Sequence, residues 1–297
     1  MGHCGTVGNV TPPPSPSLRT LALPERVDVV ALVLVVAAVW CYVAGVRRLR
    51  RRGRHWSAGR TTAFVSGAVV IVVATQTGVA RYDTILFSDH VLQHVLLGML
   101  APVLLALGAP ITLALQAGGS STKRMLRHAL DTPVARALTH PVTATVLFGA
   151  TLFVLYFTPL YELSLRNGVV HAWVHIHFVV VGVLFAEVIV GLDLSRHRTD
   201  YLARLGLVMA TVPFHAFLGV ALLSSTTVLA ADWYAGTGRT WGANALADQR
   251  AGAGILWAAG EVFGLLLAGV VLARWMAHSE REARRHDRLL DAGVAAR

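Results

Sequence analysis

Long apolar stretches alternate with short polar segments along most of this 297-residue chain. A helix needs about 20 predominantly apolar residues to cross the hydrocarbon core of a bilayer. Seven stretches approach or exceed that length, at residues 28–46, 61–80, 88–108, 141–157, 169–190, 203–226 and 251–276. The pattern predicts an all-α fold, an integral membrane helix bundle with seven transmembrane helices.

The segments that flank these spans are polar. Residues 1–27 include TPPPSPS and little that could build a core, so we expect a disordered, Pro-rich outer tail. The first span begins too late to be a cleavable signal, and we expect it to remain as an anchor. The basic segment between spans three and four is weakly amphipathic, which favours a position at the inner membrane surface. Residues 277–297 form a charged tail with helical potential.

Composition and charge fit this class of protein. The chain is 55% hydrophobic and 14% charged, too apolar for an ordinary soluble domain of its size. Of its 26 Lys and Arg residues, 20 follow spans one, three, five and seven, and only 6 lie in the alternate segments. The positive-inside rule therefore places the N-terminus outside and the C-terminus in the cytoplasm. This topology explains the net charge of +10 better than a nucleic-acid partner does.

Histidine pairs mark the third and fifth spans. His90 and His94 stand four residues apart in SDHVLQHVLLGML, and His171 and His175 do so in HAWVHIHF. Each pair therefore lies on one face of its helix, one turn apart. Both spans run inward from the outer surface in the predicted topology, so the pairs lie at the same height. Ionisable side chains are costly in lipid, and imidazole is a ligand for copper, zinc, iron and nickel, so we expect a metal site.

Further polar side chains lie deeper in the predicted bundle. His215 on span six and Glu261 on span seven are both roughly 15 Å below the outer surface. We expect Glu261 to fix the tautomer of His215, at the end of a polar path that leads inward from the outer histidines. Met99 falls near this depth, where packing is a more typical role for it than ligation.

Three other residues lie close to the histidine pairs. His177 points about 200° around its helix from His175, so we expect it to serve another partner. Asp89 and Asp248 lie at the outer rim, where they could orient ligand rings or attract cations.

These residues alone are also compatible with other kinds of site. Membrane di-iron desaturases also carry paired histidines, although those face the cytoplasm. In a b-type cytochrome, facing helices each supply an axial histidine to a haem, and His94 with His171 or His175 fits that geometry. A Ser-His-Asp hydrolase is poorly supported, because Ser88, Asp89 and His90 are only sequence neighbours and no nucleophile elbow is present.

Several motifs follow one another between about residues 87 and 288. They are FSDHVLQHVLLGMLAPVLLALGAP, HAWVHIHFVVVGVLF, PFHAFLGVAL, DWYAGTGRTWGANALADQRAGAGILWAAGE and a tail that ends in ARRHDR. In these motifs the chain resembles the CtaG family of bacterial cytochrome c oxidase assembly factors. That family is distinct from the single-span copper chaperone that shares its name in some bacteria.

The resemblance assigns the histidines to family motifs. His90 and His94 take the place of the family's first His pair, and His215 that of the His after Pro. The second His cluster corresponds to His171, His175 and His177. The outer loop and final span match at Trp233, Tyr234, Trp241, Asp248, Gln249 and Glu261.

The same resemblance implies a multi-pass protein of the bacterial cell membrane that assists maturation of a haem-copper oxidase. Its proposed role is to form the copper B centre of subunit I. We therefore expect a non-enzymatic copper carrier that delivers its metal to subunit I. Its ligands would be His90, His94, His171 and His175, with His215 as a deeper relay ligand. The alternatives are a b-type haem-binding protein and a metal-free membrane scaffold for oxidase assembly.

Overall fold

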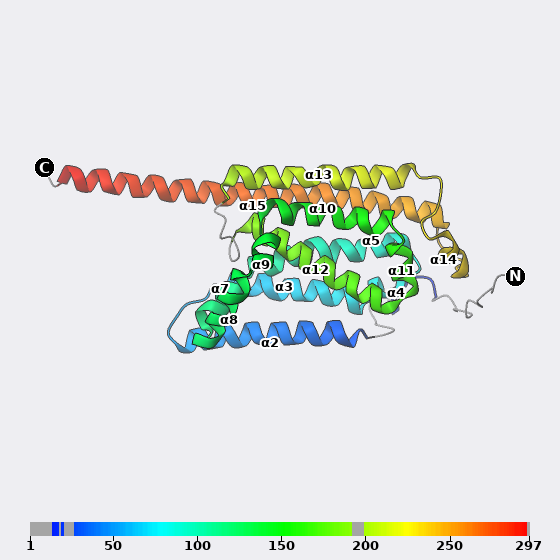
Figure 1. Cartoon of the computed structure of the whole chain (residues 1–297), viewed down its shortest axis with the longest axis horizontal. Helices are drawn as coiled ribbons and strands as arrows, with labels where there is room; N and C mark the ends of the chain where they lie inside the picture. Colours follow the sequence, from blue (N-terminus) through cyan, green and yellow to red (C-terminus); the bar gives the residue numbers. More distant parts are fainter. Residues whose placement is uncertain (1–13, 18, 21–26, 192–198, 296–297) are drawn as a thin grey trace.

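The computed structural model describes residues 14–17, 19–20, 27–191 and 199–295, and all the regular structure in them is helical. The long helices lie side by side along one common axis (Figure 1). Six spans are long and apolar enough to cross a membrane, and a bent pair of helices supplies a seventh. This confirms the predicted all-α membrane bundle of a multi-pass protein.

The spans follow the apolar stretches of the sequence closely. Span one is α2 (Val29–Arg51), and span two is α3 (Ala58–Gln76) continued by α4 (Gly78–Tyr82). Span three comprises α5 (Phe87–Val95), the π-helix η1 (Leu96–Leu100), α6 (Ala101–Leu107) and α7 (Pro110–Ala117). The later spans are α10 (Pro141–Phe157) with α11 (Leu160–Arg166), α12 (Gly168–Val190), α13 (Tyr201–Ser224) and α15 (Ala245–Ala295). The bend between α10 and α11 is 71°.

Short helices lie outside the spans. The basic segment predicted at the inner surface forms α8 (Ser120–Asp131) and α9 (Pro133–Leu138), neither of which has a buried residue. At the opposite end, α14 (Ala231–Gly236) precedes α15. The predicted charged tail is not separate, because α15 continues through it to Ala295. The predicted disordered tail, residues 1–27, falls mostly outside the described residues.

The third span occupies the centre of the bundle. Its segment α5–η1–α6 packs against α3, α12 and α15, and α15 in turn packs along α13. Gly182 on α12 makes a close approach possible, because a Cβ atom there would collide with the carbonyl of Gly98 and the ring of Pro102. Small residues of this kind let transmembrane backbones come near each other. The histidines of α5 and α12 are thereby held in the interior.

A π-helical turn begins two residues after His94. Leu96–Leu100 adopt hydrogen bonding of the π type in the middle of the span. Pro102 comes just after this turn and has no N–H to donate to the preceding turn, which is a local reason for its widening. The distortion that a proline in mid-span suggests is therefore a π-turn at Leu96–Leu100 in this structure.

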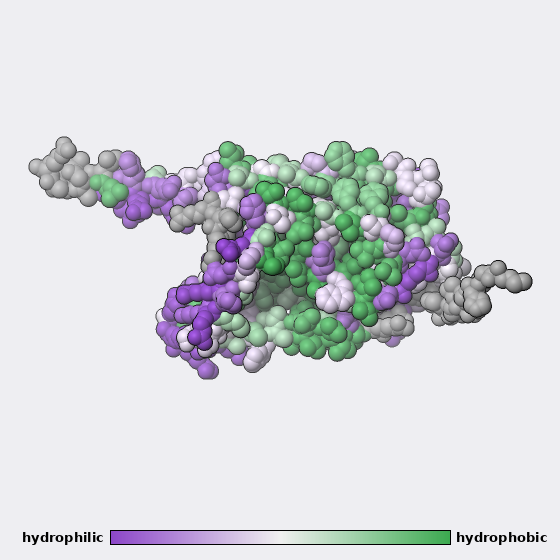
Figure 2. All heavy atoms as spheres, in the orientation of Figure 1, coloured by the Kyte–Doolittle hydropathy of each residue, from purple (hydrophilic) through white to green (hydrophobic). Residues whose placement is uncertain are grey.

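Polar residues gather at the two ends of the bundle, and an apolar belt lies between them (Figure 2). One end carries α8, α9 and the Arg-rich end of α2, and α15 projects beyond it (Figure 1). We refer to it as the basic end. The opposite end carries α4, α11 and α14. We refer to it as the outer end, after the topology that the positive-inside rule predicts.

This orientation predicts a labelling result. With Cys4 and Cys41 replaced by Ser, a T240C variant should react with a membrane-impermeant maleimide in intact cells. An H55C variant should react only after permeabilisation, because Thr240 is exposed at the outer end and His55 at the basic end. The reverse pattern would invert the predicted topology.

Candidate metal centre

Four imidazole rings meet in one layer between α5 and α12, near the outer end. Ring centroids lie 4.1 Å apart for His90 and His94 and 4.3 Å apart for His171 and His175. Between the helices, the His90–His171 and His94–His175 distances are both 5.7 Å. The rings therefore form a rectangle, as expected for two i, i+4 pairs on parallel helices at one height. We call these residues the four-His cluster.

Most of the nitrogens in this cluster are buried without a hydrogen bond. His90 is fully buried, and His94 and His171 are 3% and 9% exposed. Both ring nitrogens of His90 and of His94 lack a hydrogen-bond partner among the described residues. An unsatisfied buried polar group costs about 1–3 kcal/mol, so such a set of nitrogens is typical of a site that binds something.

Gln93 determines which nitrogen of His175 is free. The Gln93 amide nitrogen donates to the carbonyl of Ala74 (2.9 Å), so its oxygen faces His175 Nε2 (2.8 Å). This amide orientation requires His175 to carry its proton on Nε2 and leaves the lone pair on Nδ1. A ligand histidine commonly donates its second ring nitrogen to an oxygen in this way.

Asp83 completes a potential ligand set. Its Oδ2 lies 3.3 Å from His171 Nε2, and one ligand atom from each of Asp83, His171 and His175 lies within 4.8 Å of the others. Sequence reasoning missed both Asp83 and Gln93. The available signals were a buried acid in the RYDT turn just before span three and an amide inside an apolar span.

A cleft gives access to the cluster from the outer end. Its volume is about 340 Å³, and its walls include Asp28, Asp83, Gln93, His171 and His175. Two carboxylates in its wall favour the approach of a cation. His90 and His94 do not line this cleft and lie behind the other pair.

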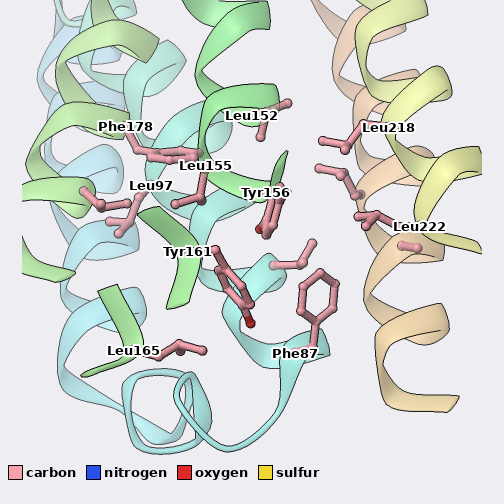
Figure 3. Packing of buried hydrophobic residues seen from close by; sticks show 14 of the residues in the cluster. Phe87, Leu97, Leu152, Leu155, Tyr156, Tyr161, Leu165, Phe178, Leu218 and Leu222 are labelled. Carbon is pink, nitrogen blue, oxygen red and sulfur yellow. The ribbon is translucent and has the colours of Figure 1, made fainter. Parts of the chain in front are cut away.

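Aromatic side chains enclose the far side of the cluster, and two of them, Phe178 and Tyr161, belong to the apolar core shown in Figure 3. Phe178 stacks on His94 with 4.3 Å between centroids, and Tyr161 meets His90 edge to face at 5.0 Å. The Tyr161 hydroxyl is hydrogen-bonded to that of Tyr234 at 2.5 Å. Burial raises the pKa of the Tyr234 hydroxyl, so this pair is neutral at physiological pH. The wall therefore adds no negative charge next to His90.

Asp248 acts on the helix that carries the first pair. Its carboxylate, at the start of α15, accepts hydrogen bonds from the Phe87 backbone N–H (2.6 Å) and the Ser88 hydroxyl (2.5 Å). It therefore caps the N-terminus of α5. The sequence suggested that Asp248 could orient a ligand ring, but its side chain contacts the backbone and hydroxyl of α5 instead. Asp89 is partly buried on the same helix and has no side-chain hydrogen bond among the described residues.

Two of the residues that match the family's motifs, Trp233 and Gln249, connect the outer loop to the bundle. The Gln249 amide accepts from the Leu229 N–H (2.7 Å) and donates to the Thr227 carbonyl (3.1 Å). Trp233 Nε1 donates to the carbonyl of Thr84 (2.8 Å). These contacts fix the segment that carries α14 and leads to Asp248, the residue that caps α5.

His215 lies deeper than the cluster, and Glu261 does not hold it. Nδ1 of His215 is 3.0 Å from the carbonyl of Thr211, one turn earlier on α13, and no hydrogen bond to Glu261 is present among the described residues. A helical side chain leans over the preceding turn, which brings the ring to this carbonyl. The Thr211 carbonyl therefore has the role that we expected of Glu261.

Met99 and His177 lie on opposite sides of this arrangement. Met99 is buried and, with His94 and His215, lines a cavity of about 20 Å³. His177 is exposed on the outside of α12, and its Nε2 is hydrogen-bonded to the hydroxyl of Thr151 (3.0 Å). As predicted, His177 points away from the cluster and has another partner.

Comparison with known proteins agrees with the motifs. A family model described as cytochrome c oxidase caa3 assembly factor (Caa3_CtaG) matches residues 40–278. An uncharacterized protein of Mycobacterium bovis is 36% identical over 296 residues, which cover 97% of this chain and 45% of that protein. One from Mycobacterium leprae is 35% identical over 261 residues, 86% of this chain and 40% of its own. The chain thus spans less than half the length of these relatives, and no solved structure matches it.

The capping contact of Asp248 can be tested by stability. Changing Asp248 to Ala should lower the free energy of unfolding by about 2 kcal/mol, because it removes a cap and two hydrogen bonds to a charged acceptor. Unfolding in detergent micelles measures the change. Asp232→Ala, at an exposed position on α14, is the matched control. Equal stability of the two variants would show that Asp248 does not hold α5.

Proposed function

This chain belongs to the family of cytochrome c oxidase caa3 assembly factors, and from that premise we propose that it binds copper at the four-His cluster. We further propose that it delivers this copper to the copper B centre of subunit I of a haem-copper oxidase. In this role the protein is a metallochaperone and catalyses no reaction.

The observation that carries the proposal is the layer of four buried imidazoles with unpartnered nitrogens. His90 and His94 bring no hydrogen bond that a metal would have to replace, since their ring nitrogens are free of partners among the described residues. His175 is held by Gln93 with its lone pair on Nδ1. Ligands that are buried, neutral and already oriented fit a metal ion without a large rearrangement.

Copper is the metal that this donor set favours. Nitrogen ligands bind Cu²⁺ more strongly than the other divalent first-row ions, and imidazole also suits Cu(I). The carboxylates of Asp28 and Asp83 line the cleft on the outer side, where an incoming cation first meets the protein. The path that we propose therefore leads from the cleft to His171 and His175, and then to His90 and His94.

The arrangement supports an ion better than a haem. A planar porphyrin has to lie between its two axial imidazoles. Here His94 is in contact with His175 on one side and is stacked by Phe178 on another, with centroid distances of 5.7 and 4.3 Å. These contacts leave little room for a macrocycle between the rings.

Copper content of the purified protein tests the proposed site. The protein should retain copper near one equivalent or more, and the double variant H94A/H175A should lose it, because one ligand of each pair is removed. The matched control is H177A, which changes an exposed histidine of the same helix and should keep the metal. Metal analysis and an absorption spectrum should be made on one sample. Unchanged copper in the double variant, or a haem Soret band, would contradict the proposal.

The proposed delivery of copper to subunit I is tested separately in cells. A bacterial strain that lacks the gene should accumulate subunit I with haem but with little copper in its copper B centre, since only the metal delivery step is missing. Copper and haem analysis of the purified oxidase measures this. Subunit I with normal copper and missing haem would contradict the proposed cargo, and absence of subunit I would favour a scaffold role.

A further inference from the structure

A small cavity lies just inward of the four-His cluster. Its volume is about 20 Å³, and its lining includes His94, Met99, Thr151 and His215. A cavity of this size has room for one water molecule or one ion. The other lining side chains are apolar, and no carboxylate is among them.

His215 presents one available nitrogen in this cavity wall. It is 1% exposed, and its Nδ1 is paired with the carbonyl of Thr211. Since a carbonyl can only accept, Nδ1 carries the proton and the lone pair is on Nε2. Nε2 is buried and has no hydrogen-bond partner among the described residues. Gly260 on α15 supports the ring from the side, because a Cβ atom there would collide with His215.

The π-helical turn brings Met99 to the same cavity. In a regular α-helix, His94 and Met99 would point roughly 140° apart, at 100° for each of five residues. The wider turn at Leu96–Leu100, with bonds between residues i and i+5, moves residues five apart toward one face. His94 and Met99 consequently both line the cavity. Single π-turns in α-helices are frequent at functional sites.

The chemistry of this lining selects a soft, singly charged ion. Thioether sulfur and neutral imidazole are ligands that Cu(I) prefers. An apolar wall without a carboxylate raises the cost of a divalent ion more than that of a monovalent one. We propose that His94, Met99 and His215 form a second, deeper site that holds one Cu(I) ion. This inference rests on the proposed function, because the ion has to come through the four-His cluster.

His94 belongs to both sites and connects them. It faces His90 and His175 in the cluster and also lines the deeper cavity. A neutral imidazole has one lone pair, so His94 holds a metal at only one of the two sites at a time. An ion therefore moves inward by exchanging the cluster ligands for Met99 and His215 while it stays near His94.

X-ray absorption at the copper edge distinguishes the two sites. Full-length protein in detergent, loaded anaerobically with one equivalent of Cu(I), should show a sulfur neighbour. Met99→Leu should abolish this sulfur signal, because it removes the thioether. It should leave the nitrogen neighbours in place, because the change nearly keeps the volume of the side chain. Met209→Leu, at an exposed position on α13, is the matched control and should retain the signal.

Competition with a Cu(I) chelator gives a second measurement. Changing His215 to Ala should weaken Cu(I) binding by about tenfold or more, whereas His55→Ala at the basic end should not change it. Copper with nitrogen neighbours only in the unmodified protein would overturn the deeper site and leave the four-His cluster standing. A sulfur signal that persists in Met99→Leu would also overturn it. A protein that binds no copper would overturn the proposed function itself.

Discussion

Imidazole nitrogens inside a membrane protein have lost their water, and six of them in the described part of this chain, on His90, His94, His171 and His215, have no hydrogen bond in exchange. Such a loss costs stability, and apolar packing around the rings has to offset it. The central position of α5 supplies that packing, since α3, α12 and α15 surround its span. The protein thus keeps a set of lone pairs that a structural role alone would not require.

The same rings are positioned by contacts at three levels. Parallel direction of α5 and α12 puts the pairs at one height, and the approach of Gly98 to Gly182 brings the two helices close. Gln93 and the Thr211 carbonyl then fix individual rings, and Asp248 holds the end of α5. Because each of these contacts is made within the protein, the ligands of the proposed copper site would be largely positioned in advance, and less of the binding free energy would be spent on ordering them.

The spans and the paired histidines could be predicted because both depend on periodicity within one helix. Apolar length gives the spans, and i, i+4 spacing gives a shared face. Partners in space could not be predicted this way. Gln93 meets His175 across 82 positions, and Asp248 meets Ser88 across 160, so neither pairing has a local signal. The π-turn was equally hidden, since Pro102 suggests a distortion but not its type. Glu261 illustrates the opposite error, where similar depth was taken for contact and a nearby backbone carbonyl was the actual partner.

The length of α15 has a mechanical consequence. It runs for 51 residues without a break, about 75 Å at 1.5 Å per residue, from the capping carboxylate of Asp248 to a segment that projects past the basic end. A helix of this kind transmits a tilt or a push along its axis as a lever does. A protein that grips the projecting segment would displace Asp248 and loosen the start of α5 on the other side of the membrane. In the proposed copper carrier, the strength of metal retention would thereby be open to control from the face opposite to the cleft.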